Sequence, residues 1–126
     1  MMFTISNTTK KKTTISPTTF SKIKKHILGE KYDLSLVICG SKLAKTANAR
    51  YRGKSYVPNV LSFPLSKNDG EILVCLDRIE KEASEYEMNT KKFFVFLFIH
   101  GCLHLKGLSH GAKMDQAEKR LLKQFN

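Results

Sequence analysis

The sequence contains no tryptophan and only three cysteines, Cys39, Cys75 and Cys102, which form no CxxC pair. An odd number of widely spaced cysteines argues against a disulfide framework and predicts buried thiols in a reducing, cytoplasmic location. The most apolar run, FFVFLFIHGCLHL, is much shorter than the roughly 20 residues that span a bilayer, and it predicts a buried core helix. The segment MMFTISNTTKKKTT also lacks the apolar stretch of a signal peptide. These absences argue against the secreted and membrane-spanning classes.

Acidic residues are scarce as well. The chain carries 22 Lys and Arg against 11 Asp and Glu, a formal net charge of +11. The excess is N-terminal, because residues 1–58 contain 12 basic and 2 acidic side chains. Such a charge favours a polyanionic partner, nucleic acid or an anionic membrane, although lysine-rich surfaces also serve solubility alone.

The pattern of apolar residues and breakers predicts one α+β domain over residues 1–126, with a small mixed sheet of about four strands packed with helices. Ser16 and Pro17 form a helix start, and Gly29 forms a helix stop. A turn signal, SKNDG, separates two apolar runs and predicts a hairpin. The expected strands are residues 2–6, 32–39, 59–65 and 71–76, and the expected helices are residues 17–28, 41–52, 90–106 and 113–123.

The stretch HGCLHLKGLSH contains three of the four histidines. On a helix, His100 and His104 share one face, one turn apart. Gly107 can adopt a positive φ, end the helix and bring His110 back to the same point. Three histidines leave the fourth tetrahedral position of a zinc ion open, which is typical of catalytic zinc. The stretch therefore predicts a metal site on this helix and its following turn, with one Zn²⁺ per chain.

The spacing of these histidines is also that of the metzincin proteases, whose motif is HExxHxxGxxH. Those enzymes use the glutamate after the first histidine as general base. Here that position is Gly101. The pattern therefore predicts a metal-dependent hydrolase and argues against a peptidase.

Three blocks together resemble the YbeY family of single-strand-specific metallo-endoribonucleases: ARYRGKSYVPNVLSFPL, DGEILVCLDRI and IHGCLHLKGLSH. The resemblance covers about residues 35–126. It implies zinc ligands at His100, His104 and His110 and a functional arginine at Arg52. It further implies action in rRNA processing, namely 3′-end maturation of small-subunit rRNA and ribosome quality control, with the small subunit or its proteins as partners.

The chain departs from the family pattern at a few positions. Ser109 stands where an aspartate usually precedes the third histidine, and loss of that carboxylate could loosen the metal site. Pro58 and Asn59 stand where Thr and Asp or Asn are usual, and Glu71 replaces a common aspartate. None of these positions is a metal ligand.

The resemblance also suggests how RNA is bound. A planar arginine at position 52 would hold the scissile phosphate with two hydrogen bonds, and Tyr51 and Tyr56 would stack on bases or serve only as packing. Basic side chains of the first half would line a groove for the RNA backbone: Lys22, Lys24, Lys25, Lys42, Lys45, Arg50 and Lys54. The residues leave the nucleophile open between water and the RNA 2′-hydroxyl.

Two other functions fit the residues. One is another zinc-dependent hydrolase with a metzincin-like motif but without the protease glutamate. The other is a non-catalytic RNA- or ribosome-binding assembly factor whose metal is structural. A bound metal with an open fourth position would favour catalysis over both binding alone and a structural site.

Overall fold

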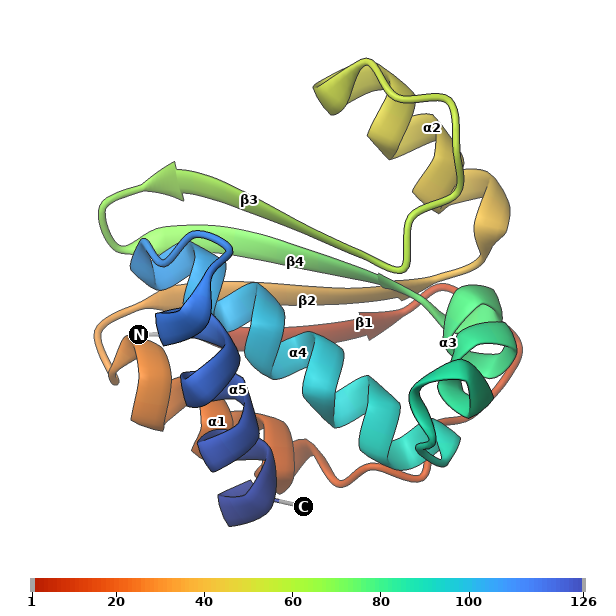
Figure 1. Ribbon diagram of the computed structural model, residues 1–126. Coiled ribbons are helices and arrows are strands. Elements are labelled where there is room, and N and C mark those ends of the chain that lie inside the picture. Colours follow the sequence, from red (N-terminus) through yellow and green to blue (C-terminus); the bar gives the residue numbers. More distant parts are fainter. Residues whose placement is uncertain (1, 126) are drawn as a thin grey trace.

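Four strands form one mixed sheet in the order β1-β2-β4-β3 (Figure 1). The structure, a computed structural model, describes residues 2–125. Strands β1, β2 and β4 are parallel, and β3 pairs antiparallel with β4, which confirms the predicted hairpin. The strands are β1 Phe3–Asn7, β2 Asp33–Cys39, β3 Val60–Ser66 and β4 Asp69–Cys75. Strand β3 is an edge strand, and its register shifts between Pro64 and Ser66.

The helices begin and end at the signals that the sequence contains. The Ser16 hydroxyl accepts a hydrogen bond from the Thr18 amide at the start of α1, and the Asn89 side chain caps α4 in the same way. Two short elements, α3 and a 3-10 helix η1, were not predicted, and Leu76 begins α3 rather than ending a strand. The helices are α1 Pro17–Leu28, α2 Ser41–Arg52, α3 Leu76–Glu82, η1 Ala83–Tyr86, α4 Thr90–Lys106 and α5 Ala112–Phe125.

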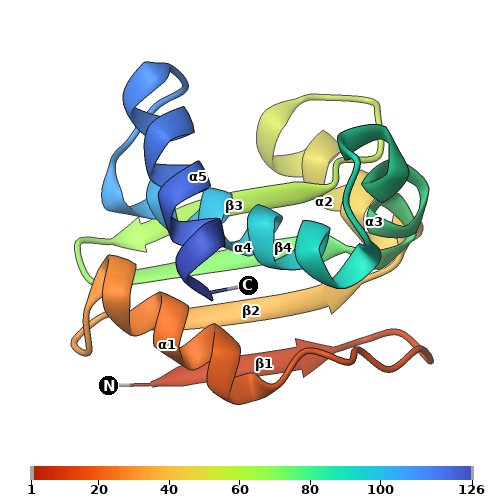
Figure 2. The same ribbon diagram turned by 60° about the horizontal axis from the view of Figure 1, so that its bottom comes forward.

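Helices α1, α4 and α5 cover one face of the sheet, and α2 lies on the other face (Figures 1 and 2). The main core lies under the three helices and is dominated by Phe20, Phe93, Phe98, Ile72 and Ile99. A smaller apolar cluster lies beneath α2: Cys39, Ala44, Ala47, Leu61, Leu73 and Cys75. This architecture confirms the predicted α+β class. Among residues 2–125, no helix is both long and apolar enough to cross a membrane.

The three cysteines are free and buried, as predicted. Burial raises the pKa of the Cys39 thiol to about 12, and it also raises the pKa of Cys102. The Cys39 and Cys102 thiols are therefore protonated at neutral pH, so they act as apolar core groups and not as nucleophiles or metal ligands.

Helix α4 crosses the sheet at very short range. A Cβ atom added to Gly101 would lie 3.0 Å from both Ser62 Oγ on β3 and Ile72 Cδ1 on β4. The Ser62 hydroxyl donates a hydrogen bond to the Gly101 carbonyl at 3.1 Å. Because position 101 is buried against the sheet, the preceding residue of α4, His100, lies beside edge strand β3.

Candidate metal centre

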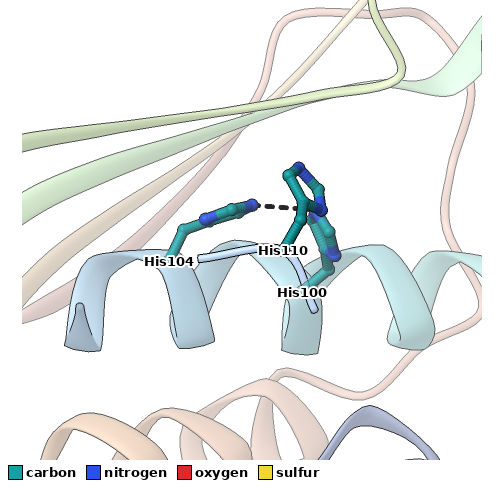
Figure 3. Close-up of side chains that lie close together, drawn as sticks. All are labelled: His100, His104 and His110. Atoms are coloured by element: carbon teal, nitrogen blue, oxygen red, sulfur yellow. Dashed lines mark hydrogen bonds between the residues drawn. The ribbon is translucent and has the colours of Figure 1, made fainter. Parts of the chain in front are cut away.

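Three imidazole rings converge beside α4 (Figure 3). His100 and His104 belong to α4, and His110 follows the turn at Gly107, which has φ 110° and ends the helix. One ring nitrogen from each histidine lies within 4.8 Å of the other two. The helical spacing and the glycine turn therefore bring together the three side chains that the sequence predicted as metal ligands.

The hydrogen bonds of two rings determine which nitrogens are available. His104 Nδ1 lies 3.1 Å from the Leu108 carbonyl, and His100 Nδ1 contacts the Glu118 carboxylate. A carbonyl and an ionised carboxylate only accept hydrogen bonds, so both Nδ1 atoms carry the proton. In a neutral imidazole, Nε2 then presents a lone pair.

His100 Nε2 and His104 Nε2 are 3.0 Å apart (Figure 3), so when both rings are neutral their lone pairs point to one place. Two bare nitrogen lone pairs at this separation repel unless a cation lies near both. The donor set therefore fits a metal ion, and imidazole nitrogens suit zinc among the common metals.

Burial next to the other imidazoles keeps His104 neutral. The pKa of His104 is lowered mainly by burial and further by the adjacent His100 and His110. Neutral imidazole is the form that binds a metal, so this shift favours binding at neutral pH.

Glu118, on α5, is the functional residue that the sequence interpretation missed. The residue is 7% exposed, and its carboxylate contacts Nδ1 of the His100 ring and leaves Nε2 free for the site. A carboxylate in this position fixes the orientation and tautomer of a metal-binding histidine. Glu118 thus provides a carboxylate contact to a histidine of the cluster. Ser109, which stands where the family usually has an aspartate, carries no charge and cannot provide such a contact.

The histidines form one wall of a cleft of about 530 Å³. Arg52, from the end of α2, lies in the same cleft although it is far from the histidines in sequence. Edge strand β3 lies between the two groups. The remaining lining residues are Tyr56, Asn59, Val60, Leu61, Ser62 and Pro64.

Arg52 is held by two neighbours. Its Nη1 lies 3.3 Å from Asn48 Oδ1 and 3.3 Å from the Tyr56 hydroxyl oxygen. Asn48 is fully buried, and its Nδ2 also donates to the Tyr56 carbonyl at 3.0 Å. The hydrogen bond from Arg52 lowers the pKa of Tyr56. Asn48 thus ties the end of α2 to the following loop and directs the guanidinium toward the cleft.

The basic side chains predicted to bind RNA lie in two separate regions of the structure. Lys42, Lys45 and Arg50 are exposed on α2, and Lys54 follows in the next loop, close to Arg52 in sequence. The α1 lysines do not join them, because α1 lies on the opposite face of the sheet (Figure 1).

The local contacts of the α1 lysines point the same way. Lys24 is only 5% exposed and donates to the Glu30 carbonyl. Lys25 pairs with the Glu30 carboxylate at 2.8 Å, and Lys22 is exposed on the same helix. The structure therefore places these three lysines apart from those of α2, and RNA binding by either group stays a prediction.

A four-stranded α+β domain thus brings three histidines that could hold a metal ion and an arginine into one cleft. The family model described as endoribonuclease YbeY matches residues 4–126, and the chain belongs to this family. The endoribonuclease YbeY of Mesoplasma florum is 32% identical over 103 residues, which cover 73% of this chain and 61% of the relative. That of Neisseria meningitidis is 36% identical over 97 residues, which cover 68% of this chain and 56% of the relative.

A solved structure shares the fold. The solution structure of a Thermotoga maritima protein superimposes with a TM-score of 0.68 at 24% identity, covering 98% of this chain and 89% of that one. The matched region spans about three fifths of the length of the curated relatives. The comparisons therefore establish the family and the fold of this chain.

Proposed function

We propose that this domain, residues 1–126, is a zinc-dependent endoribonuclease that cuts single-stranded RNA. The observation that carries the proposal is the single cleft that contains His100, His104, His110 and Arg52. Membership of the endoribonuclease YbeY family supports the same activity. By the family resemblance, we further propose a cytoplasmic role in 3′-end maturation of small-subunit rRNA and in ribosome quality control, with the small subunit or its proteins as partners.

One zinc ion per chain, held by the three histidines, would supply Lewis-acid chemistry at the scissile phosphate. Glu118 holds the His100 ring so that Nε2 faces the site, and the Leu108 carbonyl does the same for His104. These contacts orient the ligands before the ion arrives, so little side-chain freedom is lost on binding.

Arg52 is the residue that we assign to the phosphate. A guanidinium offers two parallel N–H donors to a phosphate, which a lysine ammonium cannot do. Because Asn48 and Tyr56 occupy only Nη1, the other donors of the guanidinium remain available to a phosphate. The fixed charge would stabilise negative charge that develops as the phosphodiester is cut.

The site gives less support to a peptidase. A metzincin peptidase needs a carboxylate after the first histidine, whereas Gly101 packs against Ser62 and Ile72. Among the described residues that line the cleft, none is acidic. The non-catalytic alternative, an assembly factor with a structural metal, predicts binding of RNA and zinc without cleavage.

The first experiment combines elemental analysis with a cleavage panel. We expect about one zinc per chain, cleavage of unstructured RNA, weak cleavage of duplex RNA and no cleavage of casein. His104→Ala should lose both zinc and cleavage, whereas His26→Ala, an exposed histidine on α1, should retain both. Full zinc content in His104→Ala, or stoichiometric zinc without RNA cleavage in the unmodified protein, contradicts the proposal.

The second experiment tests Arg52. Arg52→Lys should lower single-turnover cleavage by about 10²–10³ and weaken RNA affinity only modestly, as expected for a group that acts on the transition state. Arg50→Lys, two residues away and exposed, is the matched control and should cleave normally. Replacing Lys42 and Lys45 with alanine should instead weaken binding and flatten its salt dependence. If Arg52→Lys behaves like the lysine variants, Arg52 contributes only to the general electrostatic field.

A further inference from the structure

A second cleft, of about 550 Å³, lies on the α2 face of the sheet. Helix α2 covers this face only in part (Figure 1). Large apolar side chains therefore remain open to solvent there: Leu43 is 44% exposed, Tyr51 65% and Leu65 63%. The Tyr51 and Phe63 rings form its aromatic part, with centroids 5.4 Å apart at an angle of 62°.

This apolar cleft adjoins the histidine cleft across edge strand β3. Pro64 lines both clefts. Alternate residues of a strand point to opposite faces, and accordingly Ser62 faces the histidine cleft while Phe63 and Leu65 face the apolar cleft. Two neighbouring residues of α2 also face different clefts, since Tyr51 lines the apolar cleft and Arg52 lines the histidine cleft. An extended chain that leaves the histidine cleft over Pro64 therefore meets Tyr51 and Phe63 next.

The charge beside the apolar cleft is uniformly positive on α2. Residues 41–54 contain five basic and no acidic side chains. Lys42, Lys45 and Arg50 are exposed on α2. Of the described residues that line the cleft, Glu71 alone is acidic, and it lies on β4 opposite Phe63. A phosphate backbone would therefore run along α2, with its bases directed toward the apolar floor.

We infer that the apolar cleft binds unpaired bases of the RNA next to the cleaved bond, with one base stacked on Tyr51. The inference rests on the proposed function, because it extends the same RNA strand from one cleft into the other. Exposed aromatic rings beside a row of cations are the combination by which proteins hold single strands without reading sequence. A second site of this kind would also explain a requirement for single-stranded RNA, because paired bases cannot turn into the cleft.

Fluorescent RNAs test the inference directly. The protein contains no tryptophan, so 2-aminopurine in RNA can be excited with little interference. We would place this base at successive positions on either side of the cleavage site and add chelator so that the RNA stays intact. We expect strong quenching at one or two neighbouring positions in the unmodified protein. Tyr51→Ala should abolish that quenching, and Tyr51→Phe should retain it.

Binding constants provide the second measurement. Tyr51→Ala should weaken binding of an RNA of about 12 nucleotides by roughly 5- to 100-fold, the range expected for loss of one base–aromatic stack. The same variant should weaken binding of a tetranucleotide centred on the cleavage site much less, because so short an RNA does not reach the apolar cleft. Tyr86→Ala is the matched control, because Tyr86 is 50% exposed on η1, outside both clefts. Leu65→Ala provides a second variant in the apolar cleft, with a smaller expected loss. Thermal unfolding of each variant checks that the fold is kept.

The outcomes separate this inference from the proposed function. If the unmodified protein with zinc cleaves no RNA of either length, the proposed function fails. If it cleaves RNA but Tyr51→Ala keeps full quenching and full affinity for the longer RNA, the inference is overturned. The inference would also be overturned if an apolar peptide bound the protein without displacing RNA and Tyr51→Ala abolished this peptide binding. The apolar cleft would then be a site for a protein partner.

Discussion

Glu118 should control how tightly the histidine cluster holds its metal. The carboxylate lies on α5, contacts His100 Nδ1 and is almost fully buried. Glu118→Gln keeps the size of the side chain and an oxygen that can accept from Nδ1, but it removes the negative charge. Glu118→Ala removes the acceptor as well and leaves a partly buried N–H without a partner.

The expected loss follows from these two steps. Replacing the group that orients a metal-bound histidine typically costs about 10- to 100-fold in metal affinity, equivalent to about 1.4–2.7 kcal/mol. Glu118→Gln should fall near the lower figure, because a neutral acceptor remains. Glu118→Ala should fall near the upper figure, because an unsatisfied buried donor adds about 1–3 kcal/mol.

Competition of the metal-free proteins with a chromophoric zinc chelator measures these affinities. The matched control is Asp115→Asn, which removes one negative charge from the exposed side of the same helix. Circular dichroism in the presence of chelator shows whether each variant is folded before zinc is added. If folded Glu118→Ala binds zinc as tightly as Asp115→Asn, the carboxylate has no role in orienting His100 and this reasoning is wrong.

Three further predictions concern packing and pH. Gly101→Glu should restore the metzincin motif in sequence without peptidase activity, and it should lower the melting temperature because position 101 contacts the sheet; casein cleavage would contradict this. Gly70→Ala places a Cβ 2.3 Å from the Tyr32 hydroxyl and should cost about 1–3 kcal/mol of unfolding free energy in urea titrations. Tyr32→Phe should recover much of that loss, since this buried hydroxyl has no partner among the described residues; no recovery would refute the assigned clash. Hydrogen bonds from the Ser41 hydroxyl and amide lower the pKa of Asp77 below its ordinary 3.8. The stabilisation from the ionised Asp77 is therefore complete above pH 3.8 and is lost as the pH falls through the lower pKa of the folded state. The difference in unfolding free energy between the unmodified protein and Asp77→Asn should accordingly shrink in acid. A difference that does not change with pH would contradict the assignment.

The sequence predicts elements well wherever a capping residue and an apolar period agree. Ser16 and Gly29 enclose α1, and Asn89 and Gly107 enclose α4 within a residue of the expected bounds. Helix α3 was not predicted because it begins directly at the end of β4, where Cys75 provides no side-chain cap. With neither a turn signal nor a cap, the apolar run across this boundary has the pattern of one continuous strand.

The metal ligands could be predicted because they lie on one helix and its terminating turn, where spacing fixes geometry. Glu118 depends on how α5 packs against α4, which local spacing does not specify. A signal was nonetheless present: Glu118 occupies the inner stripe of α5 with Met114, Ala117, Leu121 and Leu122. A carboxylate on an otherwise apolar stripe is rarely buried without a partner.

The α1 lysines show what sequence composition cannot predict. Positive charge is additive along a sequence, but a groove requires that charges lie on one face. Which face of the sheet a helix covers depends on the connection between strands, and α1 and α2, which carry the two groups of lysines, lie on opposite faces. Composition therefore predicts that the protein attracts a polyanion. Only the topology of the fold determines where on the surface the polyanion would lie.

The burial of α4 links the maturation of the protein to its chemistry. Nine residues of this helix are buried, and it fills the space between the sheet and its neighbouring helices. The same helix sets the separation of His100 and His104, but the Glu118 contact from α5 and the cleft shared with β3 form only when α4 has docked. Arg52 reaches the cleft only when β3 has paired with β4. A partly folded chain would therefore lack the assembled cleft, so the candidate site and the fold form together.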